Sequence, residues 1–90
     1  MESVISNGKY CYACGNGYGL HSHHIYPGPD RPKAEARGLK VWLCFQCHEQ
    51  LHMHPNKGLD KQLKETAQEY YESHYGTRED FRKEFRRSYL

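Results

Sequence analysis

Apolar residues are scarce in this chain, and it has no long hydrophobic run. Hydrophobic residues make up 37% of its 90 residues, and the mean hydropathy is −1.03. No stretch approaches the roughly 20 apolar residues of a membrane-spanning helix, so we expect no membrane association. A core built from so few apolar residues needs a disulfide, a metal ion or a partner subunit to stabilise it.

Two further absences narrow the class of protein. The N-terminal stretch MESVISNGKYCYAC lacks the apolar centre of a secretory signal, so we expect a cytoplasmic protein. Repeats, low-complexity blocks and long linkers are also missing. We therefore expect residues 1–90 to form a single domain, whose first eight residues are a loose arm.

Positive and negative side chains nearly balance, and the formal net charge is only +2. Basic residues concentrate in two stretches, 31–40 and 78–87, and either stretch can face phosphate groups. In the second stretch Glu79, Asp80 and Glu84 are interleaved with the basic residues. There, an ordinary solvated surface is an equally good interpretation.

The cysteines form two CxxC pairs, Cys11/Cys14 and Cys44/Cys47. A disulfide framework is typical of secreted mini-proteins, and a secretory signal is missing here. A thioredoxin-like site requires a CxxC within a βαβ pattern, which is also missing. Two such pairs, separated by residues 15–43, are typical of one structural zinc ion bound by four thiolates.

The pattern of turn and apolar residues predicts a small α+β fold. The stretch KYCYACG is typical of a zinc knuckle, and strands are predicted over LHSHHIY and from Leu39 to Leu43. A proline-rich loop with a short helix between Asp30 and Gly38 joins the strands. A helix over residues 45–52 starts inside the second CxxC. A knuckle, a β-hairpin and a helix around one zinc ion make a treble clef.

C-terminal helices are predicted to follow the treble clef. Apolar residues recur at helical spacing over residues 60–74. Thr77 and Asp80 form a capping-box pattern at the start of a last helix. Within it, Phe81, Phe85 and Tyr89 repeat every four residues, so we expect these aromatic rings to face the core.

Histidines gather in two runs, HSHHI and CHEQLHMH. His48 and His52 lie four residues apart, on one face of the predicted helix and close enough to share a metal ion. His23 and His24 are neighbours on a predicted strand, so their side chains point to opposite faces. We expect His23 to complete a three-histidine site with an open coordination position, as in catalytic metal sites. His24 is then available as a general base on water.

For the remaining histidines we favour roles other than metal binding. His54 lies beyond the expected helix end, and His74 suits the negative end of a helix dipole. His21 shares the strand face of His23, which makes it a reserve ligand.

The assembly CYAC…HHI…LCFQCHEQLH resembles the HNH, or ββα-metal, endonucleases in their treble-clef form. That form places a CxxC, then an (Asp/His)-His pair on the first strand, then CxxCH on the helix. The resemblance implies a zinc and ββα-metal core over residues 9–54 and a helical extension over residues 55–90. The segment from HHI onward is similar to small phage-encoded members, related to recombination-enhancement, RecA-dependent nucleases.

The resemblance implies a metal-dependent endonuclease that hydrolyses DNA phosphodiester bonds with low sequence specificity, leaving 5′-phosphate ends. His24 would be the catalytic base, and His23, His48 and His52 would bind one catalytic divalent ion, either Zn²⁺, Ni²⁺, Mn²⁺ or Mg²⁺. An all-nitrogen ligand set suits zinc or nickel better than magnesium. The four cysteines would bind structural Zn²⁺. Implied partners are DNA and a recombination or phage DNA-processing protein in the host-cell cytoplasm.

Family members are expected to lay the metal motif against the minor groove and backbone of DNA, which requires phosphate contacts. Four basic residues flank the expected metal site and are the first candidates for these contacts: Arg31, Lys33, Arg37 and Lys40. No helix carries base-reading side chains at recognition spacing, so low sequence specificity is expected.

One position departs from the family pattern. The Asn in the middle of the family's His-Asn-His pattern lies a few residues before the second CxxC. The corresponding stretch here, EARGLKVWLC, contains no Asn. Its absence favours a weak or partner-dependent nuclease, or an inactive zinc module that docks on DNA or on a protein. A third alternative is a structural protein with two zinc ions, whose second site is closed by His21 or His54.

Overall fold

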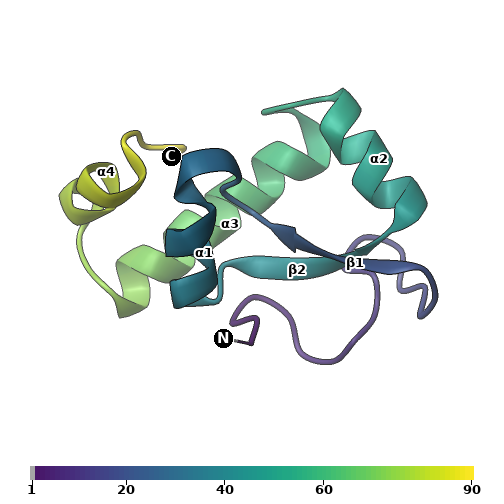
Figure 1. The fold of residues 1–90 in the computed structure, drawn as a ribbon. Helices are drawn as coiled ribbons and strands as arrows, with labels where there is room; N and C mark the ends of the chain where they lie inside the picture. Colours follow the sequence, from purple (N-terminus) through teal and green to yellow (C-terminus); the bar gives the residue numbers. More distant parts are fainter. Residues whose placement is uncertain (1) are drawn as a thin grey trace.

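The computed structural model describes residues 2–90 (Figure 1). In chain order the elements are β1 (Leu20–His24), the 3₁₀ turn η1 (Gly28–Asp30), α1 (Arg31–Arg37), β2 (Lys40–Cys44), α2 (Phe45–Met53), α3 (Gly58–His74) and α4 (Arg78–Phe85). The prediction of a small α+β fold with one β-hairpin and C-terminal helices is confirmed. Within residues 2–90, none of the helices has the length and apolar character needed to cross a membrane.

The hairpin is a two-stranded antiparallel sheet, with Leu20 opposite Cys44 and His24 opposite Lys40. Valine, tryptophan and leucine in KVWLC suit a pleated, half-buried surface. Because β2 runs straight into α2, the register brings the start of that helix beside the start of β1. Helix α2 contacts both strands, and Figure 1 shows it at the end of the hairpin opposite to α1 and α4.

The N-terminal segment runs beside α1 and β2, so the expected loose arm is wrong for residues 3 and 4. Val4 N donates to Gly38 O at 3.0 Å, and Ser3 Oγ donates to Lys40 O. Gly38 has a φ of 70°, and a Cβ there would lie 2.5 Å from Glu2 O. Glycine at this position therefore both ends α1 and admits the N-terminal backbone. The sequence gives no sign of these contacts, because each of them ends on a backbone carbonyl group.

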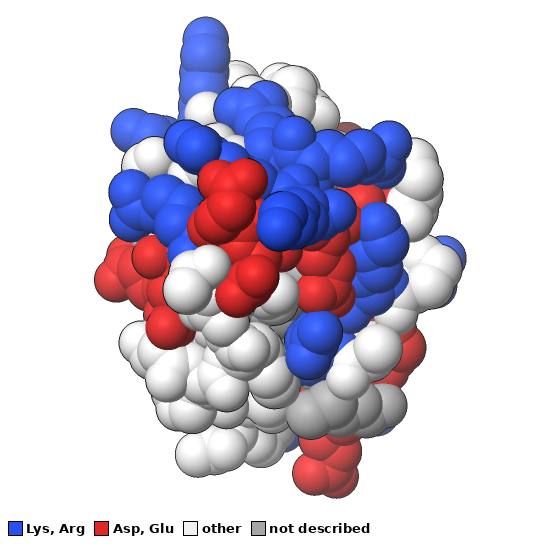
Figure 2. Space-filling model, turned by 90° about the vertical axis from the view of Figure 1, so that its left-hand side faces the viewer, with Lys and Arg blue, Asp and Glu red and all other residues white. Residues whose placement is uncertain are grey.

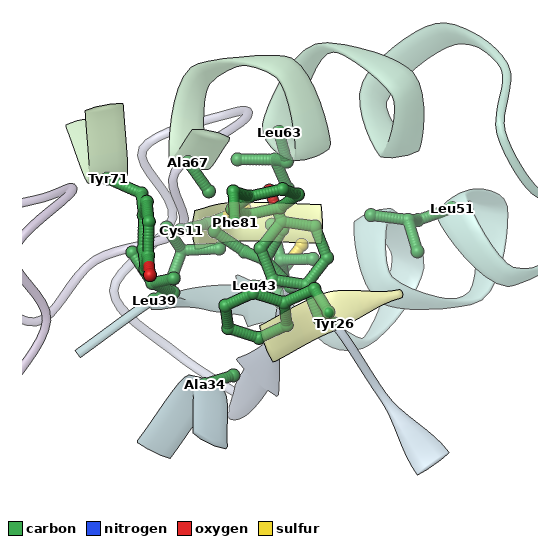
Figure 3. Packing of buried hydrophobic residues seen from close by; sticks show 14 residues of the cluster. Cys11, Tyr26, Ala34, Leu39, Leu43, Leu51, Leu63, Ala67, Tyr71 and Phe81 are labelled. Carbon is green, nitrogen blue, oxygen red and sulfur yellow. The ribbon is translucent and has the colours of Figure 1, made fainter. Parts of the chain in front are cut away.

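Helix α3 supplies the centre of the core (Figure 3). Its buried stripe includes Leu63, Ala67 and Tyr71, as the helical spacing predicts. Figure 3 shows these side chains gathered with Tyr26 and residues of the hairpin. The Tyr26 hydroxyl donates to the Lys64 carbonyl oxygen at 2.6 Å, which anchors α3 to the segment that follows β1.

Helix α4 closes the core at the other side. Its first turn has the predicted capping box: Thr77 Oγ1 accepts from Asp80 N at 3.1 Å, and Asp80 Oδ2 accepts from Thr77 N at 2.9 Å. Phe81 and Phe85 are buried, with ring centroids 5.4 and 4.7 Å from that of Tyr26. The predicted inward-facing rings are therefore confirmed for Phe81 and Phe85. Tyr89 was expected in the same helix, but it lies beyond the end of α4, where its partly buried ring stacks on Tyr26 with centroids 5.3 Å apart.

Candidate metal centres

The four cysteines come together from two separate segments. Cys11 and Cys14 lie in the turn before β1, Cys44 ends β2, and Cys47 lies in the first turn of α2. All four thiols are free, and their sulfur atoms lie within 4.8 Å of one another. Cys14 Sγ is 3.7 Å from Cys44 Sγ. Two sulfur atoms bound to one tetrahedral zinc ion at about 2.3 Å are about 3.8 Å apart. The group can therefore hold a structural metal ion such as zinc.

The electrostatics of this group also suit a cation. Although burial opposes ionisation, backbone N–H groups of Cys44 and Cys14 lower the pKa of Cys11 to about 6. Burial, and then the neighbouring thiols, raise the pKa of Cys47. The first thiolate therefore forms readily, whereas further thiolates repel one another. A divalent cation offsets this repulsion and allows all four sulfur atoms to bind as thiolates.

Three histidines form a second group, next to the first. His23 comes from β1, and His48 and His52 come from successive turns of α2. One ring nitrogen from each lies within 4.8 Å of the other two. His48 Nε2 and His52 Nε2 are 3.0 Å apart, and two nitrogens bound to tetrahedral zinc would be about 3.3 Å apart. The structure thus brings together the three residues predicted from sequence to be ligands, and α2 carries residues of both groups.

His23 gives a direct test of whether an ion fits this position. Its side chain is 4% exposed, and its buried Nε2 has no hydrogen-bond partner among the described residues. Leaving such an atom unsatisfied costs about 1–3 kcal/mol. Burial, and then repulsion from His48 and His52, lower the pKa of His23 to about 4. The ring is therefore neutral at physiological pH, which is the state that binds a metal ion.

His24, the expected general base, points away from this group. As the next residue on β1, it projects from the opposite face of the strand to His23. Its Nε2 lies 2.7 Å from Glu35 Oε1, and its side chain is 9% exposed. Lys40 Nζ binds the same carboxylate at 2.7 Å. Sequence reasoning missed Glu35, because no metal-ligand spacing or recurring motif marks a single glutamate in a short helix.

The other histidines lie outside the group of three. His21 is exposed, and its ring centroid is 5.5 Å from that of His48. His54 is exposed and follows α2. His74, in the last turn of α3, stacks on Tyr70 with centroids 3.9 Å apart.

The four expected DNA-binding residues lie in different environments. Arg37 forms an ion pair with Glu84, and Lys40 forms one with Glu35. Lys33 Nζ donates to the Glu84 carbonyl oxygen at 2.6 Å. Among the described residues, Arg31 is exposed and has no acidic partner. Figure 2, which views the end of the molecule formed by α1 and α4, shows Lys and Arg side chains crowded together, with Asp and Glu between them.

No protein-family model, curated protein or solved structure matches the chain. The structure by itself defines a small α+β protein in which a four-cysteine group can hold a structural metal ion, with a three-histidine group beside it.

Proposed function

We propose that this chain is a metal-dependent endonuclease of the HNH, treble-clef type, which hydrolyses DNA phosphodiester bonds. One observation carries the proposal: His23, His48 and His52 converge, and the buried His23 Nε2 has no hydrogen-bond partner among the described residues. A divalent ion bound there would satisfy this nitrogen. The four-cysteine group beside it would bind structural zinc and hold the hairpin against α2.

The number of ligands supports catalysis over a second structural site. Structural zinc sites have four protein ligands, whereas catalytic sites have three and an open position. The group here has three. His21, whose ring lies beside that of His48, and His54 are exposed and lie outside the group. His52 is exposed, which leaves the group accessible from solvent.

The reaction proposed is attack of water on a phosphodiester. The water oxygen bonds to phosphorus and the bond to the 3′ oxygen breaks. The leaving 3′ oxygen takes a proton from solvent water, so the products are a 5′-phosphate and a 3′-hydroxyl. A bound divalent ion would offset the negative charge that develops on the phosphate and the leaving oxygen. His24 would accept the proton that the attacking water loses.

The placement of His23 and His24 on opposite faces of β1 fits this reaction. In an in-line displacement the attacking and leaving oxygen atoms lie on opposite sides of phosphorus. Within residues 2–90, β1 pairs with β2 along one edge only. A phosphate at the other edge would therefore have the metal ligands on one side and His24 on the other.

The basic end of the molecule would contribute DNA affinity through phosphate contacts. Arg31, Lys83 and Arg87 are exposed and have no acidic partner within 4 Å among the described residues. Arg86 Nη2 lies 3.1 Å from Asp30 Oδ1, so the residues after α4 lie beside the start of α1. Contacts to phosphate groups do not distinguish one base sequence from another. The choice of cutting site would therefore depend on DNA structure or on a recombination or phage DNA-processing partner.

A second candidate function is an inactive zinc module that docks on DNA or on a protein. One observation favours it: His24 is hydrogen-bonded to Glu35 and lies outside the three-histidine group. This candidate predicts the same metal binding with no phosphodiester cleavage.

Plasmid nicking separates the two candidates. Purified protein is incubated with supercoiled DNA and Zn²⁺, Ni²⁺, Mn²⁺ or Mg²⁺ in turn, alongside His24→Ala and a control variant, His54→Ala. A nuclease requires cutting by the wild type and by His54→Ala, and a loss of about 10²-fold or more in His24→Ala at unchanged metal content. Equal cutting by all three proteins would remove His24 from the mechanism, and no cutting with any metal would leave the docking module.

A further inference from the structure

The His24 ring is fixed by a carboxylate from another element. Glu35 lies in α1, within the connection between the two strands, and its Oε1 is 2.7 Å from His24 Nε2. Lys40, which is opposite His24 in the sheet register, donates to both oxygens of Glu35 at 3.0 and 2.7 Å. The imidazole and the carboxylate are thus held by three separate elements, β1, α1 and β2.

The chemistry of this contact selects one tautomer of His24. The Lys40 ammonium, above all, keeps the pKa of the Glu35 carboxyl well below its usual range, so the group is ionised. An ionised carboxylate only accepts hydrogen bonds. His24 Nε2 must therefore carry a hydrogen and donate it. In the neutral ring, the lone pair that can accept a proton is then on Nδ1.

We propose that Glu35 is a positioning residue for His24. Its carboxylate orients the ring and fixes the Nε2–H tautomer, so that Nδ1 is the atom that accepts the proton from water. Lys40 holds Glu35 in place, and in this account it serves the base rather than the DNA backbone. The catalytic part of this inference rests on the proposed nuclease function, whereas the tautomer does not.

The tautomer can be measured without any activity. Long-range ¹H–¹⁵N spectra of zinc-loaded protein, labelled at histidine nitrogens, distinguish Nε2–H from Nδ1–H rings. We expect the Nε2–H pattern for His24 in the wild type, and in the control Glu69→Gln, which changes an exposed glutamate of α3. In Glu35→Gln the amide can donate as well as accept, so we expect a mixture of tautomers.

Kinetics then test the catalytic consequence. In Glu35→Gln we expect kcat to fall about tenfold or more, with KM within about twofold and metal content unchanged. A purely structural role would instead lower thermal stability and the active fraction, with no change of tautomer.

The inference would be overturned if His24 carried its hydrogen on Nδ1 in the wild type. It would also be overturned if Glu35→Gln left both the tautomer of His24 and kcat unchanged. The wild-type spectrum decides the tautomer even if Glu35→Gln fails to fold. The two proposals can also fail separately. If the wild type cuts no DNA, the nuclease function fails. If His24 still shows the Nε2–H pattern in that protein and loses it in Glu35→Gln, Glu35 nevertheless fixes the tautomer of His24.

Discussion

Arg37 of α1 forms a two-bonded ion pair with Glu84 of α4. Arg37 Nε lies 3.1 Å from Glu84 Oε1, and Nη2 lies 3.0 Å from Oε2. The Tyr71 hydroxyl donates to the same carboxylate at 3.1 Å, and the guanidinium lies 4.7 Å from the Tyr75 ring centroid. Because these contacts occupy its guanidinium, we expect Arg37 to serve the fold more than the binding of DNA.

This distinction predicts different behaviour for two arginines of the same helix. Arg37→Ala should lower the free energy of unfolding by about 1 kcal/mol, since a paired and stacked guanidinium is lost. Arg31→Ala should leave stability unchanged and reduce the slope of log affinity for DNA against log salt by about 1. Urea unfolding and DNA-binding titrations over a range of salt concentrations measure the two effects. A reduced salt slope in Arg37→Ala but not in Arg31→Ala would contradict the assignment.

Removing one thiol should remove the structural metal and most of the fold. In Cys44→Ser the zinc content should fall by at least one equivalent, and cooperative thermal unfolding should be lost. The reason is that metal-binding energy is folding energy in a domain with so small a core. Metal analysis and circular dichroism measure both outcomes. A serine variant that unfolds cooperatively at the wild-type temperature would show that the ion does not stabilise the fold.

The hydroxyl of Tyr26 should contribute measurably to stability. Tyr26→Phe keeps the buried ring but removes the 2.6 Å hydrogen bond to the Lys64 carbonyl oxygen. We expect a loss of about 1 kcal/mol in the free energy of unfolding. Tyr18→Phe is the matched control, because Tyr18 is 84% exposed and should tolerate the change without effect. Equal urea midpoints for the two variants would argue against the hydrogen bond.

Two histidines near α2 should differ in metal binding. His48→Ala should reduce the metal content from two equivalents to one, since only the four-cysteine group remains complete. His54→Ala should retain two equivalents, because His54 is exposed beyond the end of α2. Metal analysis after dialysis measures the difference. Loss of one equivalent in His54→Ala would place that residue among the ligands.

Local spacing predicted much of this structure. The two CxxC pairs, the four-residue interval between His48 and His52, and the capping box at Thr77 are short-range patterns whose geometry follows from the backbone. For this reason the members of each ligand set that are close in sequence could be expected to lie together. That Cys11 and Cys14 meet the second CxxC pair, and that His23 meets His48 and His52, depends on long-range packing, and it was expected from the resemblance to a known motif. The aromatic repeat of α4 was predictable on the same basis, because a helical stripe of rings has to be buried.

Long-range polar contacts could not be predicted in this way. Nothing in the sequence indicates that Glu35 meets His24, that Arg37 meets Glu84, or that the N-terminal backbone binds Gly38. Such pairs depend on how α1 packs between the strands and α4, and a surface charge looks the same in sequence whether it is paired or free. This limit affected the prediction of DNA-contacting residues most, since two of the four basic residues that it named form ion pairs with glutamates.

The proposed nuclease requires one divalent ion shared by His23, His48 and His52, with a position left for phosphate. Cobalt(II) loaded into both groups reports on this in its visible absorption spectrum. The bands absent from His48→Ala belong to the three-histidine group and should shift when inorganic phosphate is added, while the thiolate bands stay unchanged. Histidine bands that do not respond to phosphate, or a wild-type spectrum identical to that of His48→Ala, would contradict the account.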